Sequence, residues 1–153
     1  MTNTIDARLA ELGLTLPDAP APAANYVPVV QTGNQIYVSG QLPNGPDGLI
    51  TGKLGADLEV EAGAEAAKHC ALALLAQARK AAGGDLGRVR LVKLVGFVNS
   101  AAEFGDQPKV VNGASDLMVD VLGDNGRHAR SAVSAASLPF GVAVEIEGIF
   151  ELL

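Results

Sequence analysis

Val142-Ala-Val-Glu-Ile-Glu-Gly-Ile-Phe-Glu151 decides the fold, because its side chains alternate between two kinds of position, as those of a strand with two different faces do. One set is apolar and suits a core covered by helices: Val142, Val144, Ile146 and Phe150. The other set mixes carboxylates with apolar side chains: Ala143, Glu145, Glu147 and Ile149. A mixed face of this kind fits a half-buried boundary between subunits. We therefore expect a sheet with helices on one face and a further copy of the chain on the other.

The segments around this strand supply the rest of an α+β domain. Periodicity and turn signals predict strands over 26–31, 35–39, 89–99 and 129–136, and helices over 4–12, 59–82 and 107–123. A hairpin turn at 32–34 joins the first two strands, and 42–55 reads as a loop rich in Gly and Pro. We expect both long helices to cover the same face of the sheet.

Residues 1–25 form a leader to this single domain, which we place at residues 26–153. The predicted leader helix has one apolar side, made by Ile5, Leu9 and Leu12. Pro17, Pro20 and Pro22 then make an extended connector, since proline lacks a backbone N–H and has a fixed φ. We expect no second domain to begin there.

The composition is that of a folded, acidic chain of 153 residues, 48% hydrophobic and 18% charged. Its 11 basic and 17 acidic residues give a net charge of −6, which does not attract nucleic acid or anionic lipid. One cysteine, Cys70, and two histidines, His69 and His128, supply no ligand set for a structural metal site. The N-terminus lacks the pattern of a signal peptide, and no stretch reaches the ~18 apolar residues that cross a bilayer. We expect a cytosolic protein without a metal, a membrane or a nucleic-acid partner.

Polar residues in apolar surroundings are the candidates for chemistry. Arg130 is either a rim arginine paired with a carboxylate or the receiver of an anionic ligand, since guanidinium can meet a carboxylate with two hydrogen bonds. Glu145 and Glu147 are either solvated or, where half-buried, acid–base groups with raised pKa values. His128 is either a solvent-facing loop residue or a base, and His69 on a polar helix face has no predicted role. No nucleophile elbow and no phosphate loop occurs in the sequence.

Several blocks resemble the signature of the Rid (YjgF) family, the reactive-intermediate deaminases that also carry the label endoribonuclease L-PSP. In chain order they are Tyr26, Gln35-Ile-Tyr-Val-Ser-Gly-Gln41, His128-Ala-Arg-Ser-Ala-Val133, Leu138-Pro139 and Val142-Ala-Val-Glu-Ile-Glu147. The resemblance runs from Tyr26 to the C-terminus, and the combination of Ser-Gly-Gln with Arg-Ser, Leu-Pro and Glu-Ile-Glu is fairly specific.

This resemblance implies a chorismate-mutase-like α+β fold with two long helices on one face of the sheet, assembled as a homotrimer with clefts between subunits. It implies hydrolysis of enamine or imine acids such as 2-aminoacrylate to 2-keto acids and ammonia, without metal or cofactor. A relative acting on 2-aminomuconate-like acids would use the same arginine. The motif match assigns the substrate carboxylate to Arg130 and the positioning of water to Glu145. It assigns the lining of the pocket to further residues: Tyr26, Ser39, Asn112 and Ala132.

The chain departs from the family pattern at three places that bear on this pocket, one of which is an apparent insertion near Asp106, before the helix that carries Asn112. The family's Gly-Pro-Tyr reads Ala24-Asn25-Tyr26, and the cysteine that usually follows the arginine by two residues is Ala132, which offers only backbone groups. Two other functions stay open. One is a trimeric sensor of small acids with the same pocket and no turnover. The other is the endoribonuclease or translation inhibitor of the family label, which the net charge of −6 disfavours.

Overall fold

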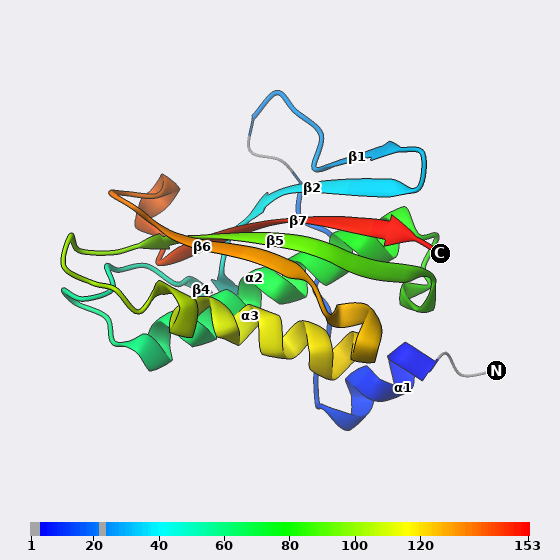
Figure 1. Ribbon diagram of the computed structural model, residues 1–153, viewed down its shortest axis with the longest axis horizontal. Helices are drawn as coiled ribbons and strands as arrows, with labels where there is room; N and C mark the ends of the chain where they lie inside the picture. Colours follow the sequence, from blue (N-terminus) through cyan, green and yellow to red (C-terminus); the bar gives the residue numbers. More distant parts are fainter. Residues whose placement is uncertain (1–3, 22–23) are drawn as a thin grey trace.

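The computed structural model describes residues 4–21 and 24–153, and its centre is a five-stranded sheet with helices on one face (Figure 1). The strands are β1 (Val29–Thr32), β2 (Gln35–Gln41), β5 (Val89–Asn99), β6 (Ala129–Ala135) and β7 (Val144–Leu152). They lie side by side in the order β1-β2-β7-β5-β6. β6 is parallel to β5, and the other neighbouring pairs are antiparallel.

Two long helices, α2 (Val60–Ala81) and α3 (Gln107–Leu122), form the second layer, and α1 (Thr4–Glu11) packs against α3 (Figure 1). α2 is rich in the strong helix formers alanine and leucine, and Gly83 and Gly84 follow its end with positive φ. Pro108 lies in the first turn of α3, where its missing N–H removes no helical bond. The predicted α+β architecture, with both long helices on one face, is confirmed.

The core fills the space between the two layers. Alternate residues of β7 are fully buried against the helices: Val144, Ile146 and Phe150. The apolar stripe of α3 is buried opposite them: Val110, Ala114, Leu117, Met118 and Val121. Cys70 of α2 belongs to the same core. The expected alternation therefore holds within β7 from Val144 to Phe150, whereas Ala143, which the alternation places on the open face, is buried in the core just before the strand.

The two long helices approach so closely that their backbones touch. A Cβ atom added to Gly113 of α3 would run into the backbone carbonyl of Ala64 on α2. Only a residue without a side chain fits there. This close approach sets the position of α3 above β5 and β6.

Short connections complete the chain. A small hairpin, β3 (Asn44–Gly45) and β4 (Gly48–Leu49), lies apart from the main sheet, and three single turns of 3-10 helix follow α2, α3 and β6. These turns are η1 (Leu86–Arg88), η2 (Gly123–Gly126) and η3 (Pro139–Gly141). Within the described ranges, no helix combines the length and the apolar character needed to span a bilayer.

The structure corrects several of the expected boundaries. The last strand begins at Val144 rather than Val142, because Val142 pairs with Thr51 in an isolated bridge outside the main sheet. The first strand begins at Val29 rather than Tyr26, because Pro28 has no N–H to donate to a ladder and residues 24–28 lie outside the sheet. The expected loop at 42–55 contains the β3–β4 hairpin, whose turn is the Gly-Pro-Asp-Gly run at 45–48. Parts of the expected leader, residues 1–3 and 22–23, lie outside the described residues.

Candidate functional site

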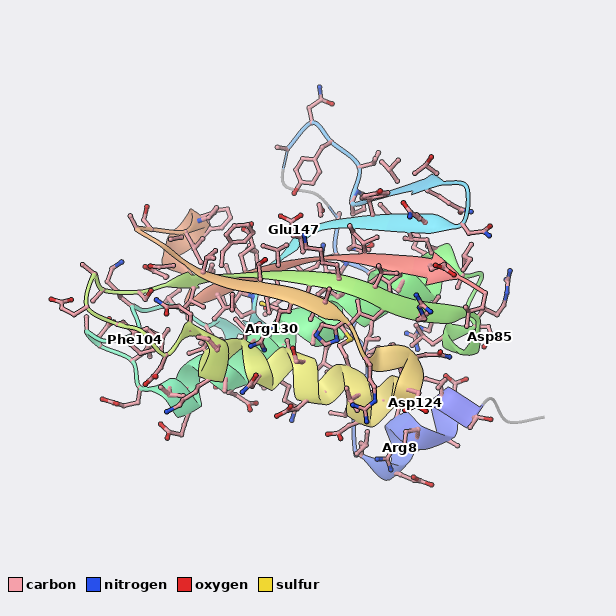
Figure 2. The ribbon with its side chains drawn as sticks, viewed as in Figure 1. Arg8, Asp85, Phe104, Asp124, Arg130 and Glu147 are labelled. Atoms are coloured by element: carbon pink, nitrogen blue, oxygen red, sulfur yellow. The ribbon has the colours of Figure 1, made fainter. Side chains whose placement is uncertain are left out.

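Arg130 lies on the edge strand β6 and reaches toward α3. In the parallel pairing with β5 it stands opposite Leu94, which is buried on the helix face. Its Nη1 donates to Oδ1 of Asn112 at 2.8 Å and to Oγ of Ser115 at 3.2 Å. Figure 2 shows Arg130 between β6 and α3. Arg130 is half-buried as a residue, and across the described residues no carboxylate forms an ion pair with its guanidinium.

The hydrogen bonds of Arg130 continue through Ser115 into the loop before β6. Oγ of Ser115 lies 2.9 Å from Nε2 of His128, and Nδ1 of His128 lies 2.6 Å from the carbonyl oxygen of Gly126. Arg130, Ser115 and His128 line an open cavity of about 270 Å³ together with Asp116, Val119 and Arg127.

Ala132 lies two residues beyond Arg130 on β6 and therefore on the same face of the strand. It is half-buried and packs against the core. We call the group on this side of the sheet the arginine half-site: Asn112, Ser115, Arg130 and Ala132.

Glu145 lies on β7 and faces away from the helices, opposite Phe97 of β5. Its carboxylate lies against Gly40, since a Cβ on that glycine would be 2.5 Å from Oε2 of Glu145. The pairing of β2 with β7 shifts between Val38 and Gln41, so Gly40 lies in a bulge that opens space for the carboxylate. Burial raises the pKa of Glu145, and the negative charge of Glu147 raises it further. The shift moves this carboxyl group toward the range that is useful for proton transfer at neutral pH.

Tyr26 and Ser39 line a cavity of about 170 Å³ that also includes Gly40. The backbone N–H of Ser39 donates to the carbonyl of Pro28 at 2.9 Å, which holds the segment after Tyr26 against β2. The leader contributes Pro20 to the same wall. Because Gly40 touches both this cavity and Glu145, we call the second group the glutamate half-site: Tyr26, Ser39, Gly40 and Glu145.

The two half-sites do not meet within one chain. β5 lies between β6 and β7, so Arg130 and Glu145 are separated by two strand spacings, about 10 Å across the sheet, and also by three residues along β5, from Leu94 to Phe97. They also project from opposite faces. Figure 2 shows Arg130 on the helix side and Glu147, which shares the face of Glu145, on the other side. The six predicted site residues are thus brought together as two groups of three, and not as one pocket.

Sequence reasoning missed Ser115 and the position of His128. Ser115 follows Asn112 by three residues on α3, so the two share one side of the helix, and this spacing was available as a signal. His128 is half-buried and bonded rather than solvent-facing, because η2 turns the chain back under α3. His69 lies in neither half-site and pairs with Glu65 on α2 at 3.4 Å. In the part of the chain that the structure describes, no group of three or more His, Cys, Asp or Glu residues could hold a metal ion.

Comparisons with known proteins agree with this fold and these motifs. Residues 6–150 match the family model "YjgF/chorismate_mutase-like, putative endoribonuclease". Protein TCP17 of Trypanosoma cruzi is 54% identical over 151 residues, which cover 97% of this chain and 94% of that protein. RutC family protein y4sK of Sinorhizobium fredii is 32% identical over 135 residues, covering 88% and 93%.

A solved structure gives the same result. Protein Atu1372 of Agrobacterium tumefaciens superposes with a TM-score of 0.91 at 50% identity, over 97% of this chain and 92% of that chain. The family match begins inside α1, so it includes the leader that the signature blocks leave out. The chain therefore belongs to the YjgF family of chorismate-mutase-like fold, together with the RutC proteins.

Proposed function

We propose that the chain is a hydrolytic deaminase of small enamine and imine acids of the 2-aminoacrylate type, which it converts to 2-keto acids and ammonia. The observation that carries this proposal is the setting of Arg130. Arg130 is half-buried, its guanidinium is held by two neutral acceptors, Asn112 and Ser115, and no carboxylate of the described chain forms an ion pair with it. Both bonds start from Nη1, so the edge formed by Nε and Nη2 suits the two oxygens of a substrate carboxylate.

The proposed site is completed between neighbouring protomers of a homotrimer, with the arginine half-site of one facing the glutamate half-site of the next. The open face of the sheet supports this assembly because it leaves large apolar side chains in solvent. Tyr37 of β2 is 42% exposed and Val133 of β6 is 44% exposed. Burying these side chains against a second copy would stabilise the assembly.

The reaction needs three tasks from these residues. Arg130 binds the acid by its carboxylate and so retains it in the pocket, with the C=N carbon next to that carboxylate. Glu145, in its ionised form, takes a proton from water while the water oxygen bonds to that carbon. That proton passes to nitrogen. The new hydroxyl group then gives its own proton to nitrogen as the C=O bond forms and the C–N bond breaks, and ammonia and the keto acid leave. One water is consumed for each ammonia released.

The residues at the edges of the pocket fit the same scheme. Tyr26 and Ser39 line the cavity that also includes Gly40, the residue against which Glu145 lies, and their hydroxyl groups are the proposed holders of the attacking water. Ala132 replaces a family cysteine, so the proposed mechanism uses no thiol at this position. Its backbone remains available next to Arg130.

The test generates 2-aminoacrylate in place with a serine dehydratase and traps the surviving imine with semicarbazide. We expect the wild-type chain to lower the trapped fraction and to speed keto-acid release, and Arg130→Ala and Glu145→Ala to behave like a protein-free sample. Lys109→Gln is the matched control, because Lys109 is an exposed residue of α3 that pairs with Asp106 only, within the described chain.

Two outcomes would contradict the proposal. Wild-type protein that binds 2-oxobutanoate but leaves the trapped fraction unchanged would indicate a small-acid sensor. Cleavage of RNA that depends on salt and on Arg130 would favour the ribonuclease of the family label. The net charge of −6 argues against the second outcome, since RNA backbones are attracted by basic surfaces.

A further inference from the structure

The hydrogen bonds that link Arg130, Ser115, His128 and Gly126 form a series in which every donor points the same way. Arginine has donors only and a backbone carbonyl has acceptor sites only, so Arg130 must donate to Ser115 at one end and His128 must donate to Gly126 at the other. For a neutral imidazole this places the proton on Nδ1 and leaves Nε2 as an acceptor. Ser115 then has to donate its hydroxyl proton to Nε2 of His128.

This direction fixes how Ser115 faces Arg130. A serine hydroxyl turns freely about its C–O bond unless its proton is committed to one partner. Because His128 takes that proton at 2.9 Å, the lone pairs of Ser115 remain aimed at Nη1 of Arg130, 3.2 Å away. With Asn112 on the other side, the guanidinium is held from α3 at two points.

We propose that Ser115 and His128 are positioning residues of the carboxylate-binding site, and that they fix the Nη1 side of Arg130 so that its remaining edge meets the carboxylate of the ligand. This inference rests on the proposed function for the identity of the ligand, but not for the hydrogen-bond chain itself. The same cavity has two charged residues, Asp116 on α3 and Arg127 in the loop. Neither takes part in this series of hydrogen bonds, and Arg127 pairs with Asp124.

The predicted effect is on binding rather than on chemistry. The carboxylate is held equally in the ground state and in the transition state, so a loosened arginine raises KM and leaves kcat nearly unchanged. Loss of one hydrogen bond of this kind weakens binding about tenfold. Ser115→Ala should fold, since alanine is the better helix former.

The first experiment needs no ligand. In ¹⁵N-labelled His69→Gln protein, His128 is the sole imidazole of the chain, because the sequence holds two histidines. We expect its neutral ring to carry the proton on Nδ1, and Ser115→Ala to shift the Nε2 signal. A neutral ring protonated on Nε2, or an Nε2 signal indifferent to Ser115→Ala, would overturn the proposal.

The second experiment measures binding of 2-oxobutanoate and turnover in the same variants. Ser115→Ala should raise the Kd and the KM about tenfold with kcat within about twofold, and Ser115→Thr, which keeps the hydroxyl, should restore both. His128→Gln, which keeps an acceptor for Ser115, should lie closer to wild type than His128→Phe. Lys109→Gln should match wild type.

The results separate this inference from the proposed function. If the wild type binds the keto acid without deaminating the imine, and Ser115→Ala weakens that binding, the deaminase proposal would be contradicted. The positioning role of Ser115 and His128 would be supported. If the wild type deaminates the imine and Ser115→Ala has the same KM as the wild type, the deaminase would be supported and the positioning role of Ser115 contradicted. If the wild type neither binds a keto acid nor deaminates the imine, both proposals fail, whatever the imidazole spectrum shows.

Discussion

Glu145 is the residue at which stability and activity are predicted to conflict. Burial raises its pKa, with a smaller contribution from Glu147, so its ionised form is disfavoured in the folded state. The folded protein therefore loses stability as the pH rises from the ordinary glutamate pKa through the raised one. Glu145→Gln should increase the free energy of unfolding at neutral pH while abolishing turnover.

Chemical denaturation at neutral pH and at a pH below the ordinary glutamate pKa checks this prediction. The gain in Glu145→Gln should disappear at the lower pH, where the carboxyl group is protonated in both states. The exposed Glu103→Gln serves as control and should show no comparable gain. An equal gain at both pH values would mean that the substitution acts through packing and not through charge.

Glu147 tunes its neighbour, which predicts a shift in the pH profile. Its negative charge raises the pKa of Glu145, so Glu147→Gln should lower that pKa. Because the proposed mechanism uses ionised Glu145, the acid limb of kcat/KM should move to lower pH, with the maximum rate little changed. A limb that stays in place would assign the titration to another group.

The arginine half-site depends on the placement of α3, the helix that carries Asn112 and Ser115. Alanine in an exposed helix is worth about 1 kcal/mol more than glycine, so Gly113→Ala would stabilise an unpacked α3. Here the added Cβ meets the backbone carbonyl of Ala64, which cannot rotate away. We expect the cost of overpacking to exceed the gain in helix propensity, so that the unfolding free energy falls by about 1–3 kcal/mol.

The displacement of α3 in Gly113→Ala should also weaken ligand binding, because Asn112 and Ser115 move with the helix. Urea unfolding and a keto-acid titration measure the two effects. Gly105→Ala is the matched control, since nothing lies within 4 Å of a Cβ there. A Gly113→Ala protein as stable as the wild type would show that α2 and α3 separate at no cost.

Local patterns predicted the elements well because each depends on neighbours along the chain. β5 begins and ends at the expected residues, 89 and 99, and α3 ends one residue before the expected Gly123. The arrangement of the site was harder to predict from the sequence. The alternation in 142–151 assigns Glu145 to the open face, but the face of Arg130 depends on the register of β6 against β5, which no local pattern fixes. The contact of Ser115 with His128 likewise arises only when η2 folds back on α3.

At the scale of the whole molecule, the separation of the arginine half-site from the glutamate half-site predicts how inactive variants behave when they assemble together. One chain carries Arg130 and Glu145 on opposite faces of the sheet, so the proposed pocket would combine the arginine half-site of one copy with the glutamate half-site of another. Arg130→Ala and Glu145→Ala therefore destroy different halves. Each variant alone should be inactive, whereas a mixed assembly contains pockets in which both halves are intact.

The two variants should therefore complement each other when they are mixed in equal amounts, unfolded and refolded together. A given pocket receives an intact arginine half in one half of cases and an intact glutamate half in one half of cases, so activity should recover to about a quarter of wild type. Refolding each variant separately before mixing is the control and should give no recovery unless subunits exchange. Light scattering establishes whether the species is a trimer. Failure to recover activity in a confirmed mixed oligomer would mean that both residues act within one protomer, which would contradict the shared site.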